Sequence, residues 1–240
     1  MATASLCVIC LKPNKIWLDF LQNFTHYDVY MVVDDNSIDY KCEYKEYTKV
    51  NIVQVPDEEC KKKGYIDMNF IIKKKVTGWE KAVYYFSTIN TTYTYVWFIE
   101  DDVFIYNENT LLNIDTTYKS ADLLTNVCSE NLTGKSTVWH WTRIRIKLEP
   151  PFYRAMCCAI RVSKQLISKI RDYARVNKTL FFLEALFPTL CKYYKLEYDV
   201  PHELIDIDYH PNVIENIDKN HLYHPIKDID RHRLYRNTNI

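Results

Sequence analysis

Glycine is scarce in this sequence: only Gly64, Gly78 and Gly134 occur among its 240 residues. A glycine-rich phosphate loop needs several glycines close together, because only they let the backbone approach the phosphates closely. The three glycines lie far apart, which argues against mechanisms that depend on such a loop.

The sequence also lacks an excess of either charge, with 31 basic and 31 acidic side chains. Surfaces that coat nucleic acid or anionic membrane are strongly basic. No segment approaches the roughly 20 apolar residues of a membrane span. The apolar stretch Ala4–Leu11 is too short for a signal peptide and has no basic region before it. We therefore expect a cytoplasmic protein with no nucleic-acid partner and no membrane span.

The eight cysteines show no zinc-binding spacing. Cys7 and Cys10 are three residues apart on a predicted strand, so they point to opposite faces and cannot share a disulfide or a metal. We expect reduced thiols, as in the cytoplasm. The abundance of Asn, Ile, Lys and Tyr suggests an AT-rich genome, such as that of a large DNA virus or a parasitic microbe. For a virus, the compartment would be the host cytoplasm.

Apolar runs alternate with amphipathic segments in the first half of the chain. This alternation predicts crossover units on a mostly parallel sheet flanked by helices, an α/β fold. The predicted strands are Ser5–Leu11, Asp28–Val33, Val50–Val55 and Tyr95–Ile99, and the predicted helices are Lys15–Phe24 and Trp79–Ser87.

The second half is less regular. Ser163 is a good N-cap for a helix over Lys164–Asn177. We expect Pro188 to kink a second helix over Leu180–Tyr194. The other predicted elements are strands at Ala121–Val127 and Met156–Val162, a loop from Cys128 to Pro151, and short strands and loops from Pro201 onward.

Three consecutive acids, Glu100, Asp101 and Asp102, interrupt an apolar stretch that resumes at Val103. Buried carboxylates are costly without a partner, and ligands bind at the carboxyl ends of strands in open α/β sheets. Because successive side chains of an extended chain point to opposite sides, we expect Asp101 and Asp102 to face opposite sides of the chain. Mg²⁺ or Mn²⁺ takes one or two carboxylates and completes its shell with phosphate and water. The cluster therefore predicts a nucleoside-diphosphate site, the alternative being an acidic turn without a ligand.

A second acidic group, Asp34 and Asp35, follows another predicted strand and precedes Asn36-Ser37. Two parallel strands that end in acids build one polar rim at the edge of the sheet. By itself the segment is also ordinary turn chemistry.

Together, Val32–Ser37 and Trp97–Phe104 resemble the GT-A glycosyltransferases, whose Asp-x-Asp-type motif corresponds here to Glu100-Asp101-Asp102. The resemblance implies a single GT-A (Rossmann-like) domain over 1–240. Its first half, about 1–105, would bind the nucleotide-sugar, and about 106–240 would bind the acceptor. It also implies a hexosyltransferase-type enzyme of glycan biosynthesis that moves a sugar from a nucleoside-diphosphate sugar, such as a UDP-sugar, to a hydroxyl of a glycan or other acceptor.

The resemblance also implies roles for individual residues. Asp102 would ligate the metal, Glu100 or Asp101 would contact the ribose or sugar, and Asp34 or Asp35 would contact the nucleoside.

The family often adds a late histidine as a metal ligand. His224 is the best candidate, ahead of His221 and His210, and Lys227 could reach a phosphate. Imidazole suits Mn²⁺ better than Mg²⁺, so Mn²⁺ is favoured. A surface histidine in a polar tail is the alternative.

Inverting members of the family use a carboxylate as the base. Glu184 is a lone acid in an apolar helix, where burial would raise its pKa toward the operating pH. It could instead be a charge that the helix dipole favours.

Aromatic and basic residues elsewhere in the chain are also candidates. Trp139-His140-Trp141 could line the acceptor cleft, since aromatic faces stack on sugars, or the tryptophans could belong to the core. Lys81 could face the nucleotide, although a solvated helix lysine is the default. Lys61–Lys63 and Lys73–Lys75 are most simply solvated faces.

Two other functions fit the same pattern of elements. Nucleotidyltransferases share the sheet and the acid-bound metal, but resemble each other in a glycine-rich loop after the first strand, and Leu11–Lys15 has no glycine. A non-catalytic carbohydrate-binding protein would have little reason to keep three clustered acids. The sequence does not decide the oligomeric state.

Overall fold

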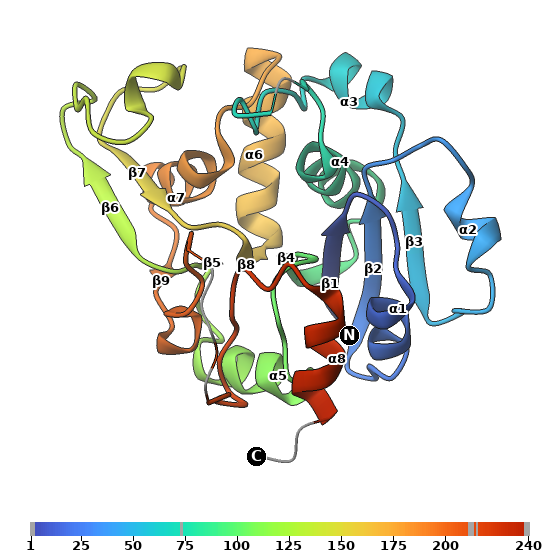
Figure 1. The fold of residues 1–240 in the computed structure, drawn as a ribbon. Coiled ribbons are helices and arrows are strands. Elements are labelled where there is room, and N and C mark those ends of the chain that lie inside the picture. The colour runs from blue at the N-terminus through green and yellow to red at the C-terminus, as the bar shows by residue number, and fades with distance from the viewer. Residues whose placement is uncertain (1–2, 73, 211–213, 215, 238–240) are drawn as a thin grey trace.

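The computed structural model describes residues 3–72, 74–210, 214 and 216–237, and a seven-stranded sheet runs through its middle (Figure 1). The strand order is β3-β2-β1-β4-β8-β5-β9. The strands are β1 (Thr3–Cys10), β2 (Tyr27–Val33), β3 (Val50–Gln54), β4 (Tyr93–Glu100), β5 (Leu123–Leu124), β6 (Cys128–Asn131), β7 (Phe152–Ala155), β8 (Ala159–Ser163) and β9 (Tyr198–Asp199). The α-helices are α1 (Lys15–Leu21), α2 (Tyr40–Glu43), α3 (Asp57–Lys63), α4 (Gly78–Tyr84), α5 (Glu108–Thr117), α6 (Lys164–Asn177), α7 (Leu183–Tyr193) and α8 (Ile229–Asn237). Shorter helical turns are η1 (Tyr85–Ile89), η2 (Trp141–Arg143) and η3 (His202–Leu204).

The sheet is mostly parallel, as predicted. β1 pairs in parallel with β2 and with β4, and β2 pairs in parallel with β3. β8 runs antiparallel to both β4 and β5, and β5 pairs in parallel with β9. The chain winds outward from β1 to β3 and then crosses back to β4 on the other side of β1. The switch point between β1 and β4 is where open α/β sheets bind ligands.

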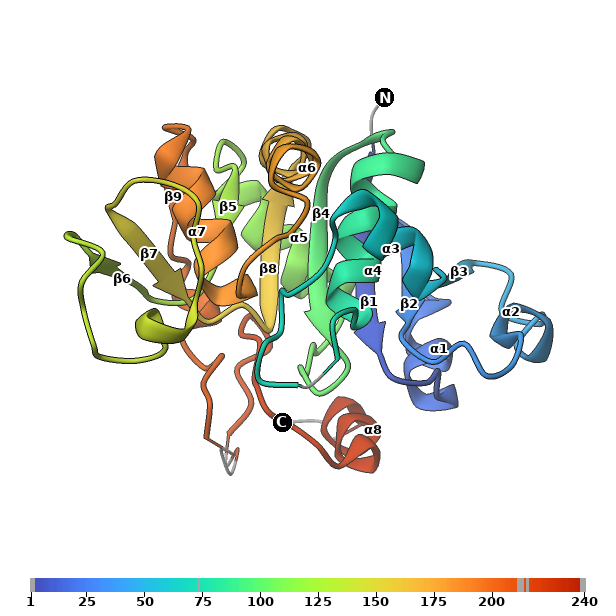
Figure 2. The same cartoon turned by 90° about the horizontal axis from the view of Figure 1, so that it is seen from above.

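Helices cover both faces of the sheet (Figure 2). Alternate residues of β1 pack in the hydrophobic layers on the two faces of the sheet, since successive strand side chains point to opposite faces. Cys7 packs in the layer that holds α4, α6 and α7, whereas Cys10 packs in the layer that holds α1 and α5. The prediction that these two cysteines face opposite sides is confirmed, and all eight cysteines are free thiols.

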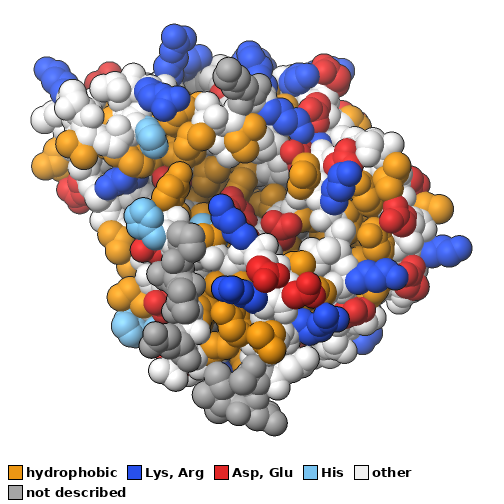
Figure 3. Space-filling model, in the orientation of Figure 1, with side chains coloured by type: hydrophobic (Ala, Val, Ile, Leu, Met, Phe, Trp, Pro, Cys, Tyr) orange, Lys and Arg blue, Asp and Glu red, His pale blue; other side chains and the backbone are white. Residues whose placement is uncertain are grey.

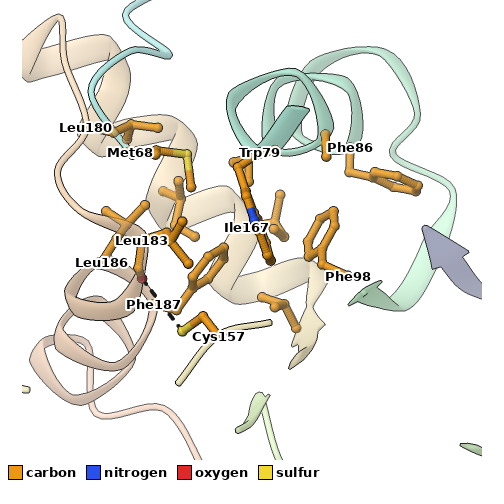
Figure 4. Close-up of a cluster of buried hydrophobic side chains, with 14 of the residues drawn as sticks. Met68, Trp79, Phe86, Phe98, Cys157, Ile167, Leu180, Leu183, Leu186 and Phe187 are labelled. Carbon is orange, nitrogen blue, oxygen red and sulfur yellow. Dashed lines mark hydrogen bonds between the residues drawn. The ribbon is translucent and has the colours of Figure 1, made fainter. Parts of the chain in front are cut away.

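An aromatic cluster fixes α4 and α7 on the sheet (Figure 4). The ring of Trp79 lies 6.0 Å, centroid to centroid, from both Phe98 of β4 and Phe187 of α7. Gly78 lets α4 begin close to β1, because a Cβ there would come within 2.7 Å of the Ile9 Cγ2 atom. The cluster therefore determines where Trp79 and the start of α7 stand relative to the end of β4.

The predicted helix over Lys164–Asn177 is confirmed, and the Ser163 hydroxyl caps it by accepting from the Leu166 N–H at 3.1 Å. α7 begins at Leu183 instead of Leu180 and continues through Pro188. No helix in the described part of the chain is long and apolar enough to cross a bilayer.

Three predictions for the second half are wrong. Only Leu123–Leu124 of the strand predicted at Ala121–Val127 is a strand, because the Asn126 carboxamide then turns the chain by accepting from the Val127 N–H at 2.6 Å. The predicted loop from Cys128 to Pro151 begins with β6, which pairs with β7 in a separate two-stranded sheet. The polar residues of β6 carry no hydrophobic alternation that would reveal a strand.

The predicted tail of short strands and loops from Pro201 instead contains a helix, α8. Most of its side chains are polar, so its sequence has no amphipathic pattern. Tertiary contacts hold it in place: the Arg236 guanidinium lies 3.4 Å from the centroid of the Phe20 ring, and the His232 ring lies 5.6 Å from that of Trp17.

Candidate functional site

The acids that follow β4 are held through their backbone. The Asp101 N–H donates to the Ile9 carbonyl at 3.1 Å, which joins the segment to β1. The Trp17 indole N–H donates to the Asp101 carbonyl at 2.8 Å, and the Ile226 N–H donates to the Asp102 carbonyl at 2.7 Å. Three distant segments therefore fix this turn at the switch point of the sheet.

The side chains of the turn carry more negative charge than their surroundings balance. Glu100 accepts from the Trp79 indole N–H at 2.6 Å, but Asp102 Oδ1 is buried with no hydrogen-bond partner among the described residues. Burial first, and the neighbouring acids next, raise the pKa of Asp101 to about 6. Burial also raises the pKa of Glu100, and the charge of Asp102 adds to the effect. The turn is an incomplete electrostatic arrangement.

His224 faces these acids. Its Nδ1 lies 2.6 Å from the Asp208 carbonyl, which can only accept, so Nδ1 carries a proton. Nε2 then points to the acids, 3.3 Å from Asp102 Oδ1 and 3.9 Å from Glu100 Oε2. Burial lowers the pKa of His224, but Asp102 and the Asp208 carbonyl outweigh it and the net pKa is raised. Metal-binding histidines are commonly oriented by such a carbonyl.

The residues at this point fit a divalent cation. Neighbouring ligands of a six-coordinate Mg²⁺ or Mn²⁺, each about 2.1 Å from the metal, are about 3 Å apart, close to the separation of His224 Nε2 and Asp102 Oδ1. Ligand atoms of Glu100, Cys158 and His224 lie within 4.8 Å of one another. Burial raises the pKa of the Cys158 thiol well above its usual range, so it stays protonated and is a poor ligand. Two carboxylates and an imidazole remain as donors.

A cavity of about 370 Å³ lies beside the turn, at the ends of β1 to β3. Asp35 is held there by the Tyr40 hydroxyl at 2.6 Å and the Ser37 hydroxyl at 2.7 Å, and these hydrogen bonds lower its pKa. The cavity is lined by Leu11, Asp34, Asp35, Asn36, Pro56, Asp57, Glu58 and Lys74. The structure thus brings Asp34 and Asp35 to the same edge of the sheet as Glu100–Asp102.

Lys81 is fully buried, so the default expectation of a solvated helix lysine is wrong. Its ammonium lies 3.2 Å from Asp34 and 2.9 Å from Asp57, which balance its charge. It also donates to the Asp34 carbonyl. Lys81 therefore orients Asp34, and a direct contact with phosphate would require these pairs to break.

The lysine runs differ in their contacts. Lys61 forms a surface pair with Glu58 at 2.7 Å, as a solvated face allows. Lys74 reaches back to Asp34 at 2.7 Å and lines the smaller cavity, so that run is not merely a solvated face. Lys73 lies outside the described residues.

A larger cavity, of about 730 Å³, lies on the other side of the turn, toward β6, β7 and α7. Glu184, Trp139 and His140 line it, whereas Trp141 belongs to the core. Burial, followed by the charge of Glu100, raises the pKa of Glu184 to about 7. The other lining residues are Ile71, Asn126, Val127, Ser129, Arg154, Ala155, Met156, Phe182, Ile205, Ile207, Asp208 and Tyr209.

Short contacts join the larger cavity to the turn. The Cys157 thiol lies 3.8 Å from the carbonyl of Leu183, the residue before Glu184. The backbone carbonyl of the next cysteine, Cys158, accepts from the Glu100 N–H at 2.9 Å. Figure 3 shows this face, where acidic and basic side chains gather beside a hollow with hydrophobic side chains in it.

The remaining histidine and lysine candidates lie as follows. Lys227 is exposed and directly follows Ile226, whose N–H is bonded to Asp102. His221 pairs with Asp206 at 2.8 Å instead of facing the acids, and His210 is exposed.

Sequence reasoning missed two residues of the site. Trp79 enters the sequence analysis only as the first residue of a predicted helix, and its indole N–H donates to Glu100. Arg154 lines the larger cavity and lowers the pKa of Glu184, but its strand carries no motif.

No known family profile matches the chain, and no curated protein matches it by sequence. Solved structures do match. The fold is similar to that of 4-diphosphocytidyl-2C-methyl-D-erythritol synthase from Anaerococcus prevotii, with a TM-score of 0.52 and 9% identity over 99% of this chain and 97% of that one. Mouse xyloside xylosyltransferase 1, in its apo form, matches with a TM-score of 0.43 and 9% identity over 84% and 85%. The first likeness supports the α/β fold, and the second is too distant to add to it.

Proposed function

We propose that the protein is a metal-dependent glycosyltransferase, which moves a sugar from a nucleoside-diphosphate sugar to an acceptor hydroxyl. The observation that carries the proposal is Asp102 Oδ1, buried and without a hydrogen-bond donor, opposite the Nε2 atom of His224. This pair lies at the switch point of an α/β sheet, between two cavities.

Asp102 and His224 would hold the cation, with Glu100 beside them. Mn²⁺ suits this mixed donor set better than Mg²⁺ because one donor is an imidazole. A bound cation neutralises charge that develops on the leaving diphosphate. Lys227, which follows Ile226, would approach a phosphate, and the nucleoside would lie in the smaller cavity, which Asp34 and Asp35 line.

Glu184 would remove the acceptor proton. A general base works best when its pKa is near the operating pH, and burial brings the pKa of Glu184 to about 7. The acceptor would lie in the larger cavity with Trp139 and His140. One direct displacement by the acceptor oxygen inverts the anomeric carbon. The hexosyl donor and the UDP carrier are part of the proposal.

A nucleotidyltransferase is the second candidate, because the fold resembles a synthase whose product carries a diphosphocytidyl group. The connection from β1 to α1 argues against it. This connection has no glycine, and the Asn14 side chain caps α1 by accepting from the Trp17 N–H at 2.9 Å. The products distinguish the two reactions: a glycosyltransferase releases the nucleoside diphosphate and a nucleotidyltransferase releases pyrophosphate.

Thermal stability with a panel of nucleotides and nucleotide-sugars, with and without Mn²⁺, tests the proposal. A ligand at about 100 times its dissociation constant stabilises the folded state by roughly 2.7 kcal/mol. We expect a Mn²⁺-dependent shift with one nucleoside diphosphate that Asp102→Ala abolishes and that Asp230→Ala retains, since Asp230 is an exposed residue of α8.

Two other results would count against the proposal. If no nucleotide shifts the melting temperature of the folded protein, the transferase assignment fails. A shift with glycan alone, without Mn²⁺, would favour a carbohydrate-binding protein.

A further inference from the structure

The larger cavity has an apolar rim that is open to solvent. Ile71, Val127, Ile205 and Tyr209 line it, yet between 50% and 69% of each residue is exposed. Large apolar side chains gathered around a concave site are typical of binding surfaces. Phe182 and Trp139, whose ring centroids are 5.6 Å apart, add aromatic wall to the same cavity.

Several polar groups of the cavity are already occupied. The Asn126 carboxamide donates to the Ile207 carbonyl and accepts from the Val127 N–H. The Ser129 hydroxyl accepts from Arg154 Nε at 2.7 Å. Arg154 also stacks over the Trp139 ring at 5.1 Å, which fixes its guanidinium against the wall. The lining also includes His140 and Asp208, whose Oδ1 already accepts from the Tyr209 N–H at 2.5 Å. Polar capacity is thus concentrated near Glu184, Arg154 and His140, and the remaining walls are largely aliphatic and aromatic.

This distribution of polar and apolar side chains favours some classes of acceptor over others. A sugar carries hydroxyl groups around its whole ring, so several would face Ile and Val side chains without a partner. Each unmatched buried hydroxyl weakens binding by about tenfold. An acceptor with one hydroxyl on an apolar body would instead match the walls and direct that hydroxyl to the polar end of the cavity.

We propose that the acceptor carries its reactive hydroxyl on an aromatic or aliphatic body and is not a free sugar. This inference rests on the proposed function. In the reaction, the acceptor oxygen bonds to the anomeric carbon of the donor. The bond from that carbon to the diphosphate oxygen breaks, and its electron pair leaves with the diphosphate. The hydroxyl proton passes to the Glu184 carboxylate, so atoms and charge balance.

Two small probes test the inference: 2-phenylethanol, with one hydroxyl on an aromatic body, and methyl β-D-glucoside, with several hydroxyls on a sugar ring. Their dissociation constants are measured by calorimetric titration of the full chain, with Mn²⁺ and each nucleoside diphosphate present. We expect 2-phenylethanol to bind at least tenfold more tightly. Val127→Asp and Ile205→Asp should each weaken its binding tenfold or more. Val176→Asp serves as the control, because Val176, at 69% exposed, is at least as exposed as the two rim residues but lies on α6, outside the cavity lining.

Equal or tighter binding of methyl β-D-glucoside would overturn the inference, as would unchanged binding of 2-phenylethanol by both rim variants. Nucleotide binding is followed in the same samples, which separates the two proposals. Loss of metal-dependent nucleotide binding with retained 2-phenylethanol binding would refute the transferase but support an apolar ligand. Retained nucleotide binding with a preference for the sugar would refute only the acceptor class.

Discussion

Two carboxylates with similar exposure, Asp115 and Asp102, have opposite surroundings. The side chain of Asp115 is 20% exposed, and that of Asp102 is 26% exposed. Asp115 Oδ1 accepts from Arg161 at 2.8 Å and from the Trp97 indole at 3.0 Å, and its Oδ2 accepts from the Tyr27 hydroxyl at 2.6 Å. Asp102 Oδ1 has no such donor in the described part of the chain.

The comparison teaches that an indole donor alone does not complete a carboxylate site. The Trp97 indole N–H donates to Asp115, and the Trp79 indole N–H donates to Glu100 in the same way. At Asp115 the fold also supplies a cation, Arg161, which is buried and forms an ion pair with Asp115 at 2.8 Å. At Glu100 and Asp102 the only nearby cation that the described residues supply is the imidazole of His224. The first arrangement balances its charges within the fold, whereas the second leaves Asp102 Oδ1 without a hydrogen-bond partner among the described residues.

The two aspartates should differ most in how far their replacement lowers the free energy of unfolding. Asp115→Ala leaves the Arg161 charge buried and unpaired, so it should reduce the free energy of unfolding by about 3–5 kcal/mol. Asp102→Ala removes a carboxylate that lies beside two other acids, and it gives up only the part-exposed ion pair with His224 at 3.3 Å. It should change the same quantity by less than about 1 kcal/mol. Urea denaturation of both variants measures the difference, and equal losses would remove the contrast between the sites.

Transfer activity should respond to Glu184. Glu184→Gln keeps the shape of the side chain but cannot accept a proton, so the rate should fall by about 10²–10⁴-fold with unchanged nucleotide affinity. Initial rates and nucleotide titrations on one preparation measure both quantities. Glu149→Gln is the control, since Glu149 is exposed and outside the cavity lining. Full activity of Glu184→Gln would end its assignment as the base.

The pH dependence of stability should reveal the same residue. The folded pKa of Glu184 is about 7, above its ordinary value of 4.5, so the folded state binds more protons than the unfolded state between these values. Wild-type stability should therefore fall as the pH rises through this window, by up to about 3 kcal/mol from this group. Glu184→Gln should remove this loss and gain most relative to wild type above pH 7. Urea denaturation at pH 5 and pH 8 tests this, and identical slopes for both proteins would contradict it.

The smallest effect expected is that of the metal alone. Mn²⁺ at ten times its dissociation constant should stabilise the wild type by about 1.4 kcal/mol. His224→Ala should lose this gain and His221→Ala should keep it, because His221 pairs with Asp206 away from the acid turn. Thermal denaturation with Mn²⁺ and with EDTA measures the gain. Its loss in His221→Ala instead would move the metal to the other histidine.

The fold was predictable where local pattern and burial agree. The apolar runs of β1, β2 and β4 and the Ser163 cap of α6 are local signals, and the acids at the strand ends follow from sheet geometry. Lys81 was not predictable, because its burial depends on Asp34 and Asp57, which distant segments bring to it. The orientation of His224 depends on a backbone carbonyl, that of Asp208, which no side-chain motif can indicate. β6 and α8 are stabilised by tertiary contacts and lack periodicity.

Because the Trp79 indole N–H donates to Glu100, the fluorescence of Trp79 should respond to binding at the site. Indole emission depends on the charge and hydrogen bonding around its ring nitrogen, and Glu100 lies 3.9 Å from the Nε2 atom of His224. A cation or diphosphate that enters beside Glu100 would alter the electric field at the Trp79 ring. The binding step would therefore register in the natural fluorescence of the protein, without a label, and Trp79→Phe would remove the contribution of this ring and leave that of Trp17, whose indole N–H donates to the Asp101 carbonyl.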